Sequence, residues 1–352
     1  MQRARGFRSD NNAGLCPEAE AALTAANDAA HHEGYGDDAY TAEAVEAFRA
    51  MFDDEVEAFF VATGTAANVL AIAALTDPWQ QVLCHRHSHY AEHESTAPER
   101  ITGCRTRVVG APGADRIEPG DLAGLSAFEP GDVHEVQAGV LTLTNASELG
   151  TVYRPAELRS LCQRAHALGY RVHVDGARFA NAVAALGCDP REISTLAGVD
   201  ALSFGGTKNG LAFGEAVLLF RQGDGSQQRR AVQRFPYLRK SAGHLISKHR
   251  FLAAPFTAAL RDGAWLRHAA HANAMATRLA DGLRALDVEP VHPVETNGVF
   301  VRLPSAVDRA LRAAGYGYYP FGDPDDGIFR LLCSFDTQLE EVDDFLAIAR
   351  SA

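Results

Sequence analysis

The sequence predicts an α/β protein with a large domain, built on a mostly parallel sheet buried between helices, and a small C-terminal α/β domain. Short apolar strands alternate with amphipathic or alanine-rich helices through the middle of the 352-residue chain. Several of these strands are almost continuously apolar, which is typical of sheets covered by helices on both faces. The rhythm changes near Gly223-Asp-Gly-Ser226, and a long helical stretch begins at about Ser247.

The individual elements follow from local patterns. We expect strands at residues 56–61, 81–84, 105–109, 139–144, 171–175, 200–204 and 216–220. An Ala/Leu-rich helix follows Gly64-Thr65 and runs to about residue 75, and residues 155–168 have helical spacing with Pro155 in the first turn and Gly169 after the end. The C-terminal part should contain a strand at 297–302, a helix to 314, a strand at 328–332 and a last helix from Gln338. We therefore expect an N-terminal segment (1–20), a large domain (21–250) and a small domain (251–352).

Composition limits the possible partners. Hydrophobic residues make up 47% of the chain and charged residues 22%, as in ordinary globular proteins. The net charge of −12 argues against non-specific nucleic-acid binding, and the longest apolar runs, such as residues 66–75, are too short to span a bilayer. Residues 1–5 are polar and no signal-peptide core follows them, and the six cysteines contain no Cys-x-x-Cys pair. We expect a cytoplasmic protein with reduced thiols that binds neither nucleic acid nor membrane.

A first candidate site is Thr63-Gly64-Thr65, which directly follows a predicted strand and opens a helix. Glycine lets the backbone approach a ligand closely, and the free N–H groups at a helix start suit a phosphate dianion. Taken alone, the turn is explained more simply as an ordinary helix N-cap.

A second candidate is Asp175, at the end of a predicted buried parallel strand. Ligands bind at the carboxyl edge of such sheets. There the carboxylate would pair with a protonated pyridine nitrogen and keep the ring an electron sink. Arg178 lies on the turn that follows, aimed toward the same region. A carboxylate that only caps the next helix is the alternative reading.

The third candidate is Lys208, in Ser203-Phe-Gly-Gly-Thr-Lys-Asn-Gly210. Lysine is rarely buried between apolar strands without a partner, and a desolvated lysine has a lowered pKa, so its neutral amine can form a Schiff base. We expect the flanking glycines to leave room for a bulky planar ligand. Lys208 stands 33 residues after Asp175, which allows one helix and one strand between them. Together the three features predict a pyridoxal 5′-phosphate (PLP) enzyme.

Several motifs make the chain similar to the L-threonine aldolase family, in the style of the bacterial low-specificity enzymes and the phenylserine aldolases. The resemblance runs from about residue 7 to about residue 340, with the motifs in family order. The motifs are Arg8-Ser-Asp-Asn-Asn12, Gly34-Tyr-Gly-Asp-Asp38, Phe60-Val-Ala-Thr-Gly-Thr-Ala-Ala-Asn68, Ser147-Glu-Leu-Gly-Thr-Val-Tyr153, His173-Val-Asp-Gly-Ala-Arg-Phe-Ala-Asn181, Ser203-Phe-Gly-Gly-Thr-Lys-Asn-Gly210 and Ser247-Lys-His-Arg-Phe-Leu-Ala-Ala-Pro255.

The resemblance implies the aspartate-aminotransferase-like fold (fold type I) and a homotetramer, a dimer of dimers with shared active sites. It assigns roles to individual residues, as follows. Lys208 would bind PLP, Asp175 would pair with its pyridine nitrogen, and Gly64 and Thr65 would bind its phosphate, with Thr207 nearby. Arg178 would lie by the cofactor oxygen and the substrate carboxylate, and Ser9 and Arg330 would help to bind that carboxylate. Tyr35 and the basic pair Arg239-Lys240 would come from the neighbouring subunit.

A histidine cluster has three readings. His85, His87 and His89 alternate, so on a strand they would share one face, with His93 and Glu94 close behind. Imidazoles and a carboxylate are usual zinc ligands, so the pattern is compatible with a metal site. On this pattern alone, a set of surface histidines is the other reading.

The resemblance favours a different role for His89, which would stack on the PLP ring with Glu94 five positions later. A register two residues earlier, with His87 and Glu92, is an alternative. Ser95 and Thr96 depart from the smaller residues usual in the family, so the surface facing the substrate is expected to differ. His134 resembles a second family histidine near the substrate side chain, or is an ordinary loop histidine. We expect no metal.

The implied reaction is reversible retro-aldol cleavage of an L-β-hydroxy-α-amino acid to glycine and an aldehyde. The base that removes the β-hydroxyl proton is left open between His89, His134, a water molecule and the cofactor phosphate. Rival readings are a β-elimination or another side-chain cleavage on the same fold, a preference for phenylserine, and a non-catalytic binding or regulatory subunit. A dinucleotide enzyme is the weakest alternative, since no Gly-x-Gly-x-x-Gly follows the first strand.

Overall fold

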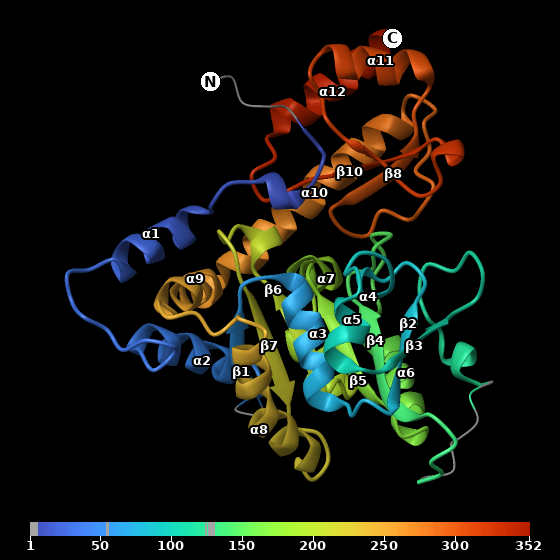
Figure 1. The fold of residues 1–352 in the computed structure, drawn as a ribbon. Helices are drawn as coiled ribbons and strands as arrows, with labels where there is room; N and C mark the ends of the chain where they lie inside the picture. The colour runs from blue at the N-terminus through green and yellow to red at the C-terminus, as the bar shows by residue number, and fades with distance from the viewer. Residues whose placement is uncertain (1–5, 54–55, 124, 126–130) are drawn as a thin grey trace.

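A seven-stranded sheet forms the centre of the chain, in the spatial order β1-β7-β6-β5-β4-β2-β3 (Figure 1). The computed structural model describes residues 6–53, 56–123, 125 and 131–352. The prediction that no signal peptide begins the chain concerns residues 1–5, which lie outside the described residues. The strands are β1 (Val56–Val61), β2 (Gln80–His85), β3 (Arg105–Val109), β4 (Gln137–Thr144), β5 (Arg171–Gly176), β6 (Ala201–Gly205) and β7 (Glu215–Phe220). All seven predicted strands are confirmed, with ends that differ by at most two residues. 

The sheet is mostly parallel, as predicted. β7 runs antiparallel to β1 and β6, and the other neighbouring pairs are parallel. Asp175 pairs with Thr144 of β4 and with Ser203 of β6, and Glu215 at the start of β7 pairs with Val61 and Gly205. The carboxyl ends of the six other strands therefore meet the start of β7 along one edge of the sheet.

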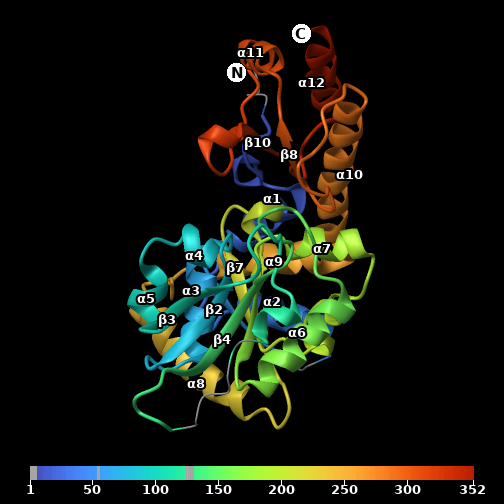
Figure 2. The same ribbon diagram turned by 90° about the vertical axis from the view of Figure 1, so that its right-hand side faces the viewer.

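Helices cover both faces of the sheet (Figures 1 and 2). Side chains alternate along a strand, so in β7 Leu218 joins one apolar cluster while Val217 and Leu219 join another. On the first face lie α2 (Ala39–Met51), α6 (Pro155–Ala167), α7 (Phe179–Leu186) and α9 (Arg250–Leu260); on the second lie α3 (Gly64–Leu75), α5 (Ala97–Thr102) and α8 (Ser226–Ser241). Residues 66–75 of α3 are all buried, which explains its uniformly apolar sequence.

The small body above the sheet edge contains an antiparallel sheet of order β8-β10-β9 (Figure 1). Its elements are β8 (Gly298–Arg302), β9 (Tyr319–Pro320), β10 (Ile328–Leu332), α11 (Ser305–Ala313) and α12 (Leu339–Ser351). The two longer strands and both helices were predicted and are confirmed.

The long helical stretch predicted from Ser247 is two helices, α9 and α10 (Ala264–Arg284). The break lies at Asp262 and Gly263, whose φ angles of 56° and 67° are left-handed and cannot continue a right-handed helix.

The two apolar cores do not divide at residue 250/251. Trp265 and Ala269, in the first half of α10, pack in the core of the large body, whereas Ala276 and Leu283 pack in that of the small one. Phe7 also belongs to the small core, and its N–H donates to Gly317 O at 2.8 Å. One continuous helix, α10, therefore contributes to both cores, and the N-terminal segment packs in part against the small one.

Further helices complete the described chain: α1 (Pro17–Ala26) and α4 (His89–Glu92), with short 3₁₀ turns at Asp10–Asn12 and Thr207–Asn209. None of the helices within the described ranges is long and apolar enough to cross a membrane. The six cysteines are free thiols, and all but Cys188 are buried, in agreement with the expectation of packed, reduced cysteines.

Candidate active site

Asp175 lies at the centre of the sheet edge with only 5% of its surface exposed. Its Oδ1 accepts a hydrogen bond from Ala177 N (3.0 Å), and its Oδ2 accepts one from Asn68 Nδ2 of α3 (2.8 Å). These two bonds fix the plane of the carboxylate at the carboxyl end of β5. Asn68 entered the sequence reading only as part of a motif, with no role of its own.

Lys208 stands in the 3₁₀ turn directly after β6 and is half-buried. One α-helix, α7, and one strand, β6, separate it from Asp175, as the spacing predicts. The charge of Lys208 lowers the pKa of both Asp10 and Glu215, so both carboxyl groups lie near its amine. The turn thus holds a lysine at the sheet edge where Asp175 lies, near the carboxyl groups of Asp10 and Glu215.

The glycines before Lys208 serve a different purpose from the one expected. A Cβ at Gly205 would lie 2.4 Å from Ala177 O, and one at Gly206 would lie 2.6 Å from Gly214 O. The space is filled by neighbouring backbone, not left for a planar ligand. Glycine is required here because the end of β6 packs directly on the turn that follows Asp175.

Glu215 is a site residue that the sequence reading missed. It begins β7, is 7% exposed, and its Oε2 accepts a hydrogen bond from Gly206 N at 2.7 Å. Burial raises the pKa of Glu215 to about 7, against the opposing effect of that hydrogen bond, the Thr207 hydroxyl and Lys208. The signal available was an acidic residue inside an apolar strand pattern.

The start of α3 lies at the same edge as Lys208. Thr63 is the N-cap, its hydroxyl accepting from Ala66 N at 3.2 Å, and no atom lies within 4 Å of a Cβ built on Gly64. Gly64 and Thr65 are half-buried and begin a helix whose positive dipole end favours an anion. Thr207, expected near the phosphate, donates instead to Gly214 O at 3.5 Å.

Two guanidinium groups meet above this edge. Arg178 pairs with Asp10 of the N-terminal segment, which also accepts from Asn297 Nδ2 at 3.0 Å. Arg330 of β10 is half-buried, and its Nε has no hydrogen-bond partner among the described residues. Burial lowers the pKa of Arg330, and the charge of Arg178 lowers it further, so the two cations lie near each other. Ser9 lies beside them as the N-cap of the 3₁₀ turn, with its hydroxyl 3.4 Å from Asp10 Oδ1.

These residues fit PLP and an amino-acid substrate. A buried N–H without a partner is costly, and the unpartnered Nε of Arg330 beside a second guanidinium suits a carboxylate. Asp175, Lys208 and the start of α3 would offer three groups that suit PLP: an anion for its pyridine nitrogen, an amine for its aldehyde and N–H donors for its phosphate. 

Within the histidine cluster, His89 is joined by Glu94 to the network around Asp175. β2 ends at His85, His87 lies in a turn, and His89 begins α4, so the three do not share one strand face. His89 Nδ1 lies 3.0 Å from Glu94 Oε1. The hydrogen bond to Glu94 raises the pKa of His89 against burial, helped by the charge of Asp175. In the alternative register, which pairs His87 with Glu92, the glutamate is exposed at the end of α4.

The metal-site reading of this cluster is also not supported. Over the described residues, the group of histidine, cysteine or carboxylate side chains close enough to hold an ion is a different one: Cys16, Glu18 and His268, with ligand atoms within 4.8 Å of one another.

His134 does not join the site within this chain. It lies in the exposed loop that enters β4, whereas Asp175 is level with Thr144, the last residue of β4. The full length of the strand therefore separates His134 from the sheet edge, because a parallel strand enters and leaves at opposite edges. The role near the substrate that the resemblance implied is therefore not explained by the single chain and stays a prediction.

Tyr35 and Lys240 lie side by side on the surface of the same chain. Lys240 Nζ lies 5.1 Å from the centroid of the Tyr35 ring, which is 52% exposed. Beyond the end of α8, His244 Nδ1 accepts from Ala62 N at 3.2 Å, so this pair is next to the turn that begins α3. A neighbouring subunit is where both were expected to act.

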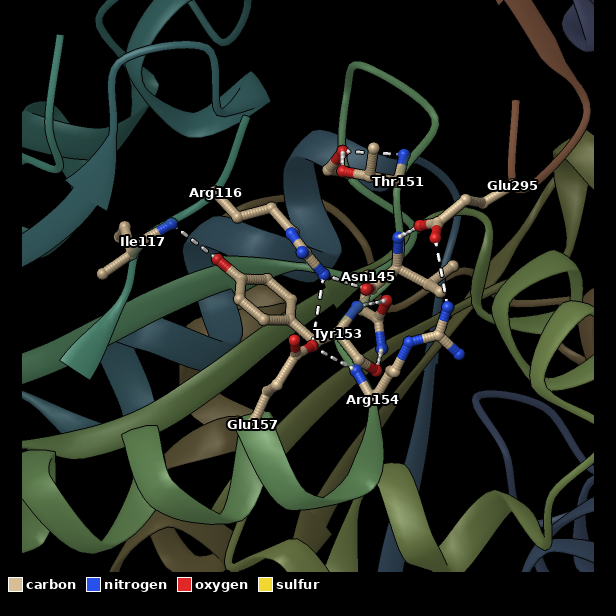
Figure 3. Close-up of polar contacts among 10 residues, drawn as sticks. Arg116, Ile117, Asn145, Thr151, Tyr153, Arg154, Glu157 and Glu295 are labelled. Carbon is tan, nitrogen blue, oxygen red and sulfur yellow. Dashed lines mark hydrogen bonds and ion pairs between the residues drawn. The ribbon is translucent and has the colours of Figure 1, made fainter. Parts of the chain in front are cut away.

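The segment after β4 is held in place by a network of polar contacts (Figure 3). Tyr153 Oη accepts from Ile117 N at 2.8 Å, and Glu295, just before β8, accepts from Val152 N at 2.7 Å and from Arg154 Nη2 at 3.3 Å. The segment also carries Glu148, whose charge acts on His89, Arg178 and Arg330. Contacts between the two bodies thus position a carboxylate beside both guanidinium groups.

Known proteins are similar to this chain over nearly its whole length. Residues 6–306 match the model of the beta-eliminating lyase family. The chain is 44% identical to the low specificity L-threonine aldolase of Pseudomonas aeruginosa over 337 residues, covering 96% of this chain and 94% of the relative. The solved threonine aldolase of Leishmania major matches with a TM-score of 0.89 at 26% identity, covering 98% of both chains. The fold is also that of the aspartate aminotransferase of Thermus thermophilus, which matches with a TM-score of 0.68 at 16% identity, covering 99% of this chain and 91% of that one.

Proposed function

Because this chain belongs to the beta-eliminating lyase family, we propose that it cleaves L-β-hydroxy-α-amino acids to glycine and an aldehyde. It is a PLP-dependent lyase of fold type I. L-Threonine and L-allo-threonine are the proposed substrates, with L-phenylserine as a further candidate. When bound, PLP supplies an electron sink for the pair released at the α-carbon of the substrate.

One observation carries the proposal: the buried Nε of Arg330 without a partner, next to Arg178 and above the edge that holds Lys208 and Asp175. A guanidinium in this setting binds the α-carboxylate of an amino acid in a defined orientation. Fixing that carboxylate selects which bond at the α-carbon is aligned for cleavage. Ser9 and Arg178 contribute to the same grip.

The other residues hold the cofactor. Lys208 provides the amine that binds the aldehyde of PLP, and Asp175 pairs with its pyridine nitrogen. Gly64 and Thr65 bind its phosphate with backbone N–H groups and a hydroxyl. His89, half-exposed beside Asp175, stacks on the ring and is placed to take up a proton.

We further propose a cytoplasmic homotetramer in which two chains complete each site. The positions of Tyr35 and Lys240 support this proposal. The exposed Tyr35 ring holds the ammonium group of Lys240, near the end of α8, at the surface of the chain, where it can contact the site of a neighbouring subunit.

The deciding experiment measures product release from L-threonine, L-allo-threonine, L-phenylserine and their D-isomers. We expect glycine with acetaldehyde or benzaldehyde from the L-isomers. Release of pyruvate and ammonia would show the β-elimination alternative, and cleavage confined to D-isomers would contradict the proposed stereochemistry.

The cofactor lysine is tested in the same preparation. The chain has three lysines, Lys208, Lys240 and Lys248. Lys208→Ala is expected to abolish both the visible absorbance of bound PLP and aldehyde release, whereas Lys248→Ala, at an exposed position, leaves both intact. An active Lys208→Ala enzyme would contradict the assignment.

A further inference from the structure

A continuous series of hydrogen bonds joins His89 to Asp175 through the side chains of Glu94 and Asn68. Glu94 Oε1 lies 3.0 Å from His89 Nδ1 and 2.8 Å from Asn68 Nδ2. The same amide nitrogen lies 2.8 Å from Asp175 Oδ2. Asn68 thus donates the two N–H groups of its amide to two carboxylates, one on each side of it.

The two ends of this hydrogen-bond series differ in burial, and the difference sets the orientation of the His89 ring. The side chain of Glu94 has no exposed surface, whereas that of His89 is 31% exposed. His89 Nδ1 faces the buried carboxylate, and Nε2 is left as the ring nitrogen on the open side. A carboxylate can only accept at Nδ1 of a neutral imidazole, so it holds the proton there and leaves the lone pair on Nε2.

We propose that Glu94 and Asn68 are positioning residues, which fix His89 in the Nδ1–H tautomer so that Nε2 accepts the proton from the β-hydroxyl of the substrate. This inference rests on the proposed function. In the transfer, the O–H bond breaks and an N–H bond forms at Nε2. The electrons of the O–H bond become the second bond of the aldehyde carbonyl, the Cα–Cβ pair leaves with the α-carbon, and the proton taken up is later returned to that carbon to give glycine.

The charges around the pair agree with this arrangement. The groups facing His89 are Glu94, Asp175, Glu148 and the ring of His93, whose centroid lies 5.7 Å away. Burial raises the pKa of Glu94, and the charge of Asp175 raises it further, while the hydrogen bonds from His89 and Asn68 lower it. Asn68 separates two carboxylates that would otherwise repel each other, and so keeps Glu94 available to His89.

The test compares Glu94→Gln with Glu92→Gln, a matched change at an exposed position two residues earlier. Glutamine keeps the shape of the side chain and removes the anion. For Glu94→Gln we expect kcat for L-phenylserine cleavage to fall about 100-fold, within the range of general-base contributions. KM and the visible absorbance of bound PLP should stay unchanged. The acid limb of the pH–rate profile should move to lower pH, because His89 loses the anion that raises its pKa.

Nuclear magnetic resonance of ¹⁵N-histidine-labelled holoenzyme reads the tautomer independently of activity. The His89 signals are identified by their loss in His89→Gln, and we expect an Nδ1–H in the wild type that disappears in Glu94→Ala. An Nε2–H tautomer in the wild type would overturn the inference. So would a Glu94→Gln enzyme with the kcat and pH profile of Glu92→Gln, or one that loses activity together with its bound PLP. Failure of the wild type to release any aldehyde would instead refute the proposed function.

Discussion

Arg178 donates two hydrogen bonds to the buried carboxylate of Asp10, from Nε to Oδ2 at 2.7 Å and from Nη2 to Oδ1 at 3.0 Å. The pair joins the turn after β5 to the N-terminal segment, which packs through Phe7 in the small core. One bidentate contact therefore connects the sheet edge, the guanidinium that we propose to bind the substrate, and the second body of the chain.

Replacing Asp10 tests this contact. Breaking a buried pair leaves an uncompensated charge, so Asp10→Asn is expected to lower the free energy of unfolding by about 3–5 kcal/mol. KM for the amino acid should rise as well, because Arg178 loses its fixed orientation. Urea unfolding and steady-state kinetics measure both effects, with Asp37→Asn at an exposed position as the control. Equal stability of the two variants would contradict the role of the pair.

The same contact predicts a dependence of stability on pH. Burial raises the pKa of Asp10, but the charges of Arg178 and Lys208 and the hydrogen bonds from Arg178 and Asn297 outweigh it, so the pKa in the folded state is lowered. The stabilisation is then present above the unfolded pKa and lost as the pH falls through the folded pKa. Wild type should lose stability in acid more steeply than Asp10→Asn.

Arg330 is predicted to act on substrate binding. Lysine at this position keeps a positive charge but loses the planar fork that matches a carboxylate. We expect Arg330→Lys to raise KM for L-threonine about 30-fold or more, since loss of a charge-assisted contact costs about 2 kcal/mol or more. The matched control is Arg309→Lys at an exposed position of α11. An unchanged KM would contradict the role of Arg330 in carboxylate binding, on which the proposed function depends.

Glu215 is predicted to make stability fall as the pH rises. Its pKa in the folded state, about 7, lies above its ordinary value of 4.5, so between these values the folded chain keeps a proton that the unfolded chain has lost. Stability therefore decreases across this window and levels off above it. Unfolding curves of Glu215→Gln should lack this contribution, whereas Glu20→Gln, at an exposed position, should retain it.

His134 and His89 should differ sharply in activity assays. His134 lies in an exposed loop at the opposite end of β4, so His134→Gln is expected to leave kcat within about twofold of wild type. His89→Gln should lose most of the activity, about 100-fold as for other general bases. A large loss in His134→Gln would indicate that a neighbouring chain brings this histidine to the site.

Local patterns were sufficient to predict most of the fold. Apolar runs of four to eight residues separated by helical spacing located all seven strands of the large sheet and the two longer strands of the small one. The break between α9 and α10 was missed, because a left-handed residue such as Asp262 leaves no distinct mark in an otherwise helical pattern. The histidine alternation was misleading for a related reason: it continued beyond His85, where the strand had already ended.

The sequence by itself determined which residues are candidates for the chemistry. A lysine between glycines, an aspartate at a strand end and a Gly-Thr helix start are each visible within a few residues of chain, so Lys208, Asp175 and Gly64 were predicted as site residues without a structure. Only the tertiary structure decided their partners. Asn68 meets Asp175 across 107 residues, and Arg178 meets Asp10 across 168. Such pairs depend on which strands lie side by side in the sheet and on which core buries each segment, and neither is recorded in the pattern around either residue.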